Sequence, residues 1–133
     1  MFYCDTSALA KLVMNEEGTR RLQDALGHGA VLVSSELVRT ELRRAVNRYE
    51  SNLVAATQRV LDGLVLVTVT ADVLDDAAMI LPPSLRSLDA IHLASALVLR
   101  EELQAVISYD RRMLTAASAL GLPVLSPGQA LEI

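Results

Sequence analysis

Short apolar segments alternate with longer helical segments along the whole chain, and this alternation limits the possible folds most. Apolar runs bounded by Gly, Ser or Asp are typical of buried strands, and the segments between them show apolar residues at helical spacing. Successive strands joined through a helix pair in parallel, because the helix returns the chain to the same end of the sheet. The pattern therefore predicts an α/β protein: a three-layer α/β/α sandwich with a central, mostly parallel sheet.

The expected elements follow one another without a linker, a repeat or a low-complexity segment. The expected strands cover residues 2–4, 30–33, 64–69, 105–109 and 124–125. The expected helices cover residues 8–13, 16–28, 36–49, 51–62, 70–81, 88–102 and 111–120. A chain of 133 residues is the length of one ordinary domain. We therefore expect a single domain over residues 1–133.

The composition excludes several classes of protein. A hydrophobic fraction of 52% is sufficient for a core, and the only cysteine, Cys4, rules out an internal disulfide or a cysteine-based zinc site. We expect Cys4 to be a small buried residue of the first strand. No apolar run is long enough to span a membrane and the start of the chain lacks a signal-peptide pattern, so we expect a cytoplasmic protein with no membrane partner. The net charge of −4 argues weakly against a nucleic-acid partner.

Two acids directly follow predicted strands. Asp5 ends the first apolar run, and Asp110 ends the run that begins at Ala105. Because the carboxyl ends of parallel strands lie at one edge of a sheet, where ligands bind in such folds, we expect both carboxylates at that edge. Asp5 alone is equally typical of a helix N-cap or a turn.

Two further acids fall inside predicted helices, on faces that are otherwise apolar. The apolar neighbours on these faces are Leu37, Val38 and Ala45 for Glu41, and Leu85, Leu93 and Ala96 for Asp89. A carboxylate on a face that packs against the core is costly unless it is paired or bound to a metal ion. The four acids together therefore indicate one acidic pocket.

Simpler interpretations of the helical acids stay open. Glu41 has Arg44 and Arg48 as possible ion-pair partners, and Asp89 suits the first turn of a helix. If the acids do form a site, it contains carboxylates, no cysteine and the isolated His92, which favours a hard cation, Mg²⁺ or Mn²⁺. Such ions activate water and stabilise charge on a phosphate during its displacement.

The four acids and their neighbours resemble the motifs of PIN domains, and more narrowly of VapC-type toxins of bacterial toxin–antitoxin pairs. The segments that carry the resemblance are Asp5-Thr6-Ser7, Ser35-Glu36-Leu37-Val38-Arg39-Thr40-Glu41-Leu42, Leu85-Arg86-Ser87-Leu88-Asp89-Ala90-Ile91-His92-Leu93-Ala94 and Ser108-Tyr109-Asp110-Arg111-Arg112. The acids occur in the family's order and spacing over essentially the whole chain. The family often has threonine at the position of Ser108, which keeps the hydroxyl.

This resemblance implies an endoribonuclease that depends on Mg²⁺ or Mn²⁺ and acts as the toxin of a type II toxin–antitoxin module. The acids matching Asp5, Glu41, Asp89 and Asp110 would bind the metal and position the attacking water. Ser7 would belong to the same pocket, with Thr6 and Ser108 as supporting residues. The family cleaves RNA to leave a 3′-hydroxyl and a 5′-phosphate, forms homodimers, and is silenced by a cognate antitoxin.

Several residues around the acids have two interpretations each. Arg86, Arg111 and Arg112 flank the acids and either hold RNA phosphates or are ordinary surface arginines. We expect His92 to be a packed residue or one that supports an acid, with Asp89 as a possible hydrogen-bond partner. An apolar group in the helical pair is a candidate dimer or antitoxin surface, with core packing as the alternative; it comprises Val46, Tyr49, Leu53 and Val54.

Two rival functions remain at this stage. A phosphotransfer domain also has an acid after its first strand, but the haloacid dehalogenase class needs a second aspartate two residues on, where this chain has Ser7. A receiver domain needs a lysine on a late strand, and Lys11 is the only lysine. The non-enzyme alternative is a catalytically inactive PIN-like binding module that acts through protein partners, against which the four intact acids argue.

Overall fold

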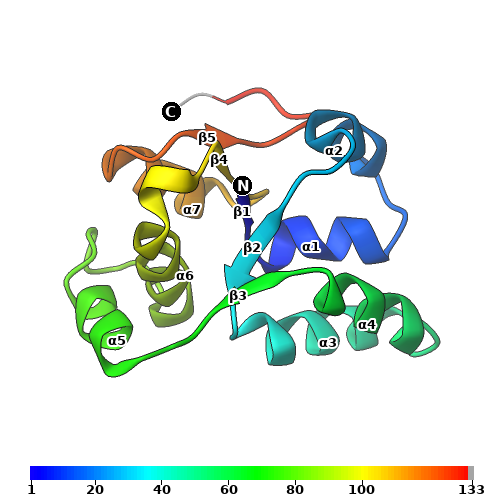
Figure 1. The fold of residues 1–133 in the computed structure, drawn as a ribbon, viewed down its shortest axis with the longest axis horizontal. Helices are drawn as coiled ribbons and strands as arrows, with labels where there is room; N and C mark the ends of the chain where they lie inside the picture. The colour runs from blue at the N-terminus through cyan, green and yellow to red at the C-terminus, as the bar shows by residue number, and fades with distance from the viewer. Residues whose placement is uncertain (132–133) are drawn as a thin grey trace.

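A five-stranded, entirely parallel sheet forms the centre of the molecule in the computed structural model, which describes residues 1–131 (Figure 1). The strand order across the sheet is β3-β2-β1-β4-β5. The strands are β1 (Phe2–Cys4), β2 (Leu32–Ser35), β3 (Val65–Val67), β4 (Ala105–Ile107) and β5 (Val124–Leu125). The predicted α/β class is confirmed, and the sheet is parallel throughout rather than mostly parallel.

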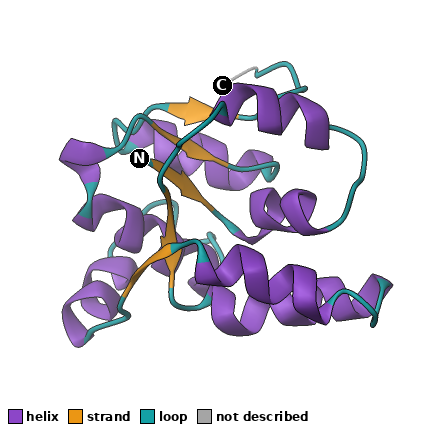
Figure 2. Cartoon of the chain, turned by 45° about the vertical axis from the view of Figure 1, so that its right-hand side comes forward, coloured by secondary structure: helices purple, strands orange, loops and turns teal. Residues whose placement is uncertain are grey.

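Helices cover both faces of the sheet, so that the strands lie in the middle layer (Figure 2). The helices are α1 (Thr6–Val13), α2 (Thr19–Leu26), α3 (Val38–Tyr49), α4 (Val54–Asp62), α5 (Ala71–Ala78), α6 (Ser87–Val98) and α7 (Arg111–Ala119), with a 3-10 turn η1 (Arg100–Glu102). In Figure 1, α1 to α4 lie on the right of the sheet and α5 to α7 on the left.

The alternation of side chains along β1 explains the two cores. Phe2 and Cys4 pack with residues of α1 to α4, whereas Tyr3 points to the opposite face and packs with residues of α6 and α7. Successive residues of a strand face opposite sides of a sheet, so a central strand buried on both faces is apolar at every position. Cys4 is fully buried, as expected.

The strand order places a crevice at the carboxyl ends of β1 and β4. The chain runs from β1 outward through β2 to β3, and then returns to β4 on the other side of β1. Loops leaving adjacent strands at such a reversal turn to opposite faces, which opens a site at that edge. Cys4 pairs with Ile107 in the register of β1 and β4, so Asp5 and Ser108 emerge next to each other.

Several predicted boundaries differ from the structure. The second strand runs from Leu32 to Ser35, two residues later than the range 30–33, because Ser34 keeps the strand conformation and its Oγ donates to the carbonyl of Cys4 (2.6 Å). The second helix begins only at Thr19, after Gly18 with a left-handed φ of 90°. The sixth helix ends at Val98 and continues as η1. The predicted domain of residues 1–133 includes residues 132 and 133, which lie outside the described residues.

Candidate metal-binding active site

Asp5 occupies the junction between β1 and α1 and is the most deeply buried of the four acids. It caps α1, and its Oδ1 accepts a hydrogen bond from the backbone N–H of Ala8 at 3.1 Å. Only 5% of the residue is exposed to solvent. The N-cap interpretation and the site interpretation are therefore compatible, because the helix cap fixes the carboxylate at the edge of the sheet.

Two serines hold the carboxylate of Asp5 from both sides. Ser7 Oγ donates to Oδ1 at 2.6 Å, and Ser108 Oγ donates to Oδ2 at 2.5 Å. Each hydroxyl also accepts a backbone N–H from the segment after β4: Ser7 Oγ from Tyr109 (2.9 Å) and Ser108 Oγ from Asp110 (3.0 Å). The same four hydrogen bonds thus orient Asp5 and fasten the loop that carries Asp110.

Glu41 reaches the pocket from α3, and its bonds come from other elements. Its Oε1 accepts a hydrogen bond from Thr6 Oγ1 at 3.2 Å and lies 2.7 Å from Nε2 of His92. The alternative pairing of Glu41 with Arg44 or Arg48 is wrong. The Glu41 carboxylate contacts Thr6 on α1 and His92 on α6, and neither arginine takes part in these contacts.

His92 connects the pocket to the core beneath it. The ring is buried, and its Nδ1 lies 2.7 Å from the hydroxyl of Tyr3. The expectation of a packed histidine that supports an acid is confirmed in the contacts, but the acid is Glu41 and not Asp89. Asp89 lies one helical turn before His92 in α6, yet its carboxylate turns outward to Arg86.

Asp89 and Asp110 line the outer part of the pocket and share one arginine. Arg86 Nε lies 3.2 Å from Asp89 Oδ2, and its Nη2 lies 3.4 Å from Asp110 Oδ2. The arginine side chain is 68% exposed, against 16% for Asp89 and 30% for Asp110. Asp110 also caps α7 through the backbone N–H of Arg112 (2.9 Å). Arg86 therefore acts as a solvated counter-ion between two acids.

One cavity of about 200 Å³ gathers these side chains. The residues that line it are Asp5, Thr6, Ser7, Glu41, Arg86, Asp89, His92 and Asp110. All four predicted acids thus line one cavity, and Ser108, which is not among the lining residues, bonds to Asp5. Arg111 and Arg112 line a different cavity of about 670 Å³, between α7 and the loop before α6. Of the three predicted phosphate-binding arginines, the structure brings only Arg86 to the acids.

The two inner acids have pKa values shifted in opposite directions. Burial raises the pKa of Asp5 even though its bonds from Ser108 and Ser7 favour the charged form. Burial also opposes ionisation of Glu41, but the hydrogen bonds that its carboxylate accepts from His92 and Thr6 favour the charged form, and the pKa of Glu41 lies below its ordinary value. A cation in the pocket would favour the ionised form of both acids.

The donor set of the pocket fits a hard divalent cation. Every candidate ligand is a carboxylate oxygen, and the nearby hydroxyls are already hydrogen-bonded to the acids. Within residues 1–131, no three acidic, histidine or cysteine side chains yet converge as a ready coordination shell. Arg86 bonds both outer acids, so a cation that used them would exchange with this arginine.

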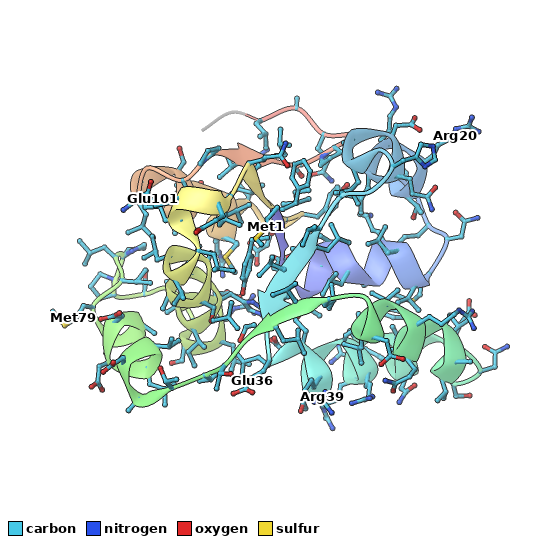
Figure 3. The ribbon with its side chains drawn as sticks, in the orientation of Figure 1. Met1, Arg20, Glu36, Arg39, Met79 and Glu101 are labelled. Carbon is cyan, nitrogen blue, oxygen red and sulfur yellow. The ribbon has the colours of Figure 1, made fainter. Side chains whose placement is uncertain are left out.

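Several features of the site were not apparent in the sequence. One is the contact of the Tyr3 hydroxyl with His92, for which the only signal is that a tyrosine in an apolar strand usually has a partner for its hydroxyl. Glu36, directly after β2, accepts a hydrogen bond at its Oε1 from the backbone N–H of Val69 (2.7 Å), which joins the end of β2 to the segment after β3. Glu36 and Arg39 are labelled in Figure 3, where Arg39 points outward from α3.

Core packing, the alternative interpretation of the apolar group, holds for Val46 and, in part, for the half-buried Leu53. Val46 is fully buried, because it lies on the face of α3 that packs against the core. Tyr49 and Val54 are exposed. The candidate surface is therefore reduced to residues near the α3–α4 turn.

The family model of the PIN domain matches residues 2–119. Ribonuclease VapC47 of Mycobacterium tuberculosis (strain CDC 1551 / Oshkosh) is 41% identical over 133 residues, which cover 96% of this chain and 98% of the relative. Ribonuclease VapC46 of Mycobacterium tuberculosis (strain ATCC 25618 / H37Rv) is 41% identical over a match that covers 94% of this chain and 96% of the relative. Ribonuclease VapC35 of Mycobacterium tuberculosis is 40% identical over a match that covers 98% of this chain and 99% of the relative.

Proposed function

The chain belongs to the PIN domain family, and on that basis we propose that it is a ribonuclease of the VapC type. It hydrolyses phosphodiester bonds within RNA and depends on a divalent metal ion, Mg²⁺ or Mn²⁺. The observation that carries this proposal is the single cavity into which four carboxylates project from different elements of the fold. The relatives over nearly the full chain are named ribonucleases, in agreement with that chemistry.

We assign the catalytic and metal-binding roles to Asp5, Glu41, Asp89 and Asp110. A bound Mg²⁺ or Mn²⁺ ion supplies positive charge that activates water and stabilises the charge that develops on the phosphate. Ser7 and Ser108 fix the plane of the Asp5 carboxylate through one oxygen each. Thr6 and His92 both bond to Oε1 of Glu41, which directs Oε2 toward the pocket.

The arginines around the pocket are proposed to bind the RNA backbone. Arg111 and Arg112 are exposed at the start of α7 and line the cavity next to the acidic one. A phosphate held there would place the following phosphodiester near the acids. Arg86 is suited to the same role once it leaves Asp89 and Asp110, because its guanidinium is largely exposed.

Partners of this protein are proposed from the family. We expect a cognate antitoxin, a homodimer and a cytoplasmic location, as for a type II toxin. No helix within residues 1–131 is long and apolar enough to cross a membrane. The exposed apolar residues near the α3–α4 turn, Tyr49 and Val54, are candidates for one of the protein contacts.

The alternative of an inactive PIN-like binding module is less well supported. A domain retained only for binding has no need to keep a buried aspartate, whose burial is costly unless it serves a purpose. The phosphotransfer alternative lacks its second aspartate, since Ser7 bonds to Asp5 at that position.

Cleavage of total cellular RNA by antitoxin-free protein tests the proposal. Reactions with Mg²⁺, with Mn²⁺ and with EDTA are compared with the same reactions of Asp5→Ala. We expect discrete fragments that need the metal and disappear in the variant, and the sequence of their ends identifies the target. Absence of cleavage by folded protein that binds Mn²⁺ would favour the inactive module.

A further inference from the structure

A buried polar chain connects the core to the acidic pocket. It begins at the hydroxyl of Tyr3 on β1, passes through the ring of His92 on α6 and ends at Oε1 of Glu41 on α3, with both links 2.7 Å long. Tyr3 is 1% exposed and His92 is 2% exposed. Polar groups this deeply buried need bonded partners, so the geometry of one link constrains the other.

The contacts of the two ring nitrogens indicate which of them carries the proton of His92. The Tyr3 hydroxyl lies 2.7 Å from Nδ1 of His92. The hydroxyls of Ser34 and Ser95 lie nearby, but each donates to a backbone carbonyl, of Cys4 (2.6 Å) and of Ile91 (2.7 Å). The carboxylate of Glu41 can only accept, so Nε2, which lies 2.7 Å from it, is the nitrogen that carries the hydrogen of a neutral ring. The phenol therefore donates, and Nδ1 accepts.

A neutral histidine that accepts at Nδ1 carries its hydrogen at Nε2. This N–H donates to Oε1 of Glu41, the same oxygen that Thr6 bonds. No group within residues 1–131 bonds to Oε2. The carboxylate therefore has one oxygen held by protein donors and one free for the pocket.

We propose that Tyr3 and His92 are positioning residues for Glu41: the Tyr3 hydroxyl holds His92 in its Nε2–H tautomer, and His92 presents Oε2 of Glu41 to the divalent cation. The catalytic role of the Tyr3–His92–Glu41 contacts rests on the proposed ribonuclease activity. The tautomer and the effect on cation binding do not, because they are measured without RNA. Neither positioning residue touches the RNA or the cation itself.

The tautomer is measured first, by ¹⁵N NMR of the histidine rings at pH 7.5 without metal. The chain has only two histidines, and His28 lies exposed in a bend, so the spectrum is readily assigned. We expect a protonated Nε2 and an unprotonated Nδ1 for His92. A proton on Nδ1, alone or together with one on Nε2, would overturn the proposal.

The second test measures Mn²⁺ binding by calorimetry in Tyr3→Phe, which removes only the hydroxyl. Loss of a single hydrogen bond that orients Glu41 is expected to weaken binding by about fivefold. The matched control is Tyr109→Phe, whose hydroxyl also donates one hydrogen bond, to the carbonyl of Pro127 (2.8 Å), but has no link to His92. Equal Mn²⁺ affinity in the two variants would overturn the proposal.

Variants of His92 separate positioning from packing. His92→Leu removes the donor, whereas His92→Gln keeps an N–H near the position of Nε2, and we expect Gln to restore part of the Mn²⁺ affinity. Thermal unfolding of each variant shows whether it is folded. If His92→Leu does not fold, the Mn²⁺ affinities of His92→Gln and Tyr3→Phe still test the positioning role. Affinity lost equally in both folded His92 variants would overturn the assigned role.

RNA cleavage then shows whether positioning matters for the reaction. We expect kcat of Tyr3→Phe to fall while KM for RNA stays unchanged, since the arginines are intact. A rise in KM alone would contradict positioning. Wild-type protein that binds Mn²⁺ but cleaves no RNA would count against the proposed function, while the tautomer and affinity results would still stand.

Discussion

The inner and outer acids of the pocket are compensated in different ways. The inner acids, Asp5 and Glu41, bond to hydroxyls, a backbone N–H and a histidine ring, all of fixed geometry. The outer acids, Asp89 and Asp110, bond to one exposed arginine. Neutral donors orient a carboxylate without cancelling its charge, whereas an arginine cancels charge but does so loosely when it is solvated.

This difference suggests a division of roles within one site. The inner half supplies a rigid negative charge that attracts a cation, and the outer half holds a cation of the chain itself, Arg86. A divalent ion that used the outer acids would replace that arginine, and the released guanidinium would be free for the proposed contact with RNA phosphates. The outer acids would thus have a positive partner in both states, and each half can be tested separately.

The largest expected effect comes from Asp5→Asn, which removes one of the two carboxylates of the inner half. We expect RNA cleavage to fall by more than about 100-fold, since loss of a metal ligand exceeds the 10–100-fold loss that its outer partners typically cause. Stability in EDTA should not fall, because burial disfavours the ionised carboxylate in the folded protein. Activity assays and thermal unfolding measure the two effects. Cleavage that survives would indicate a contaminating nuclease.

Ser108→Ala tests whether the fixed donors of the inner half matter. The substitution leaves Oδ2 of Asp5 without its 2.5 Å bond and the N–H of Asp110 without its acceptor. We expect kcat/KM to fall by about 10–100-fold. Ser108→Thr keeps the hydroxyl and serves as the control, with activity near that of the wild type. Similar losses in both variants would show that packing, rather than the bond, is responsible.

The inner acids also show what sequence alone can predict. Asp5 and Asp110 were placed correctly because parallel strands end at a common edge, which is a property of the backbone. Glu41 and Asp89 were found because an acid on an apolar helix face requires a partner. These arguments need only the order of the elements and the local periodicity. A boundary that is wrong by two residues, as for β2, does not change their result.

The partners of the acids could not be predicted in the same way. His92 bonds Glu41 rather than Asp89 because α3 and α6 approach each other across the sheet edge, and that approach depends on tertiary packing. Arg86 is near Asp89 in sequence, but its second contact, Asp110, comes from the loop after β4. The two interpretations of Val46, core packing and a partner surface, stayed open for a related reason: the sequence does not show which face of an apolar helix meets the core, and the structure places Val46 in the core.

Arg86→Ala tests the outer half, with a smaller expected effect. Removal of the competing cation should strengthen Mn²⁺ binding by a few-fold, while the metal-free protein loses less than about 1 kcal/mol of stability because the ion pairs are solvent-exposed. Arg86→Lys, which keeps the charge, is the control and should bind Mn²⁺ as the wild type does. Calorimetry at two salt concentrations measures the effect. Weaker Mn²⁺ binding in the alanine variant would contradict exchange between arginine and metal.

The smallest expected effect concerns stability against pH in EDTA. The pKa of Glu41 is lowered from its ordinary value of 4.5, so Glu41 stabilises the fold above that pH and this contribution is lost on acidification. The pKa of Asp5 is raised from 3.8, so its charge destabilises the fold above that pH and acidification removes the penalty.

The two inner acids should therefore give opposite changes in urea unfolding between pH 7 and pH 4. Compared with the wild type, Glu41→Gln should lose less stability on acidification and Asp5→Asn should lose more. Because the other acids titrate equally in all three proteins, the differences isolate these two groups. Changes of the same sign in both variants would mean that the inner half is not two differently compensated acids but one coupled pair, in which each carboxylate takes its pKa from the other.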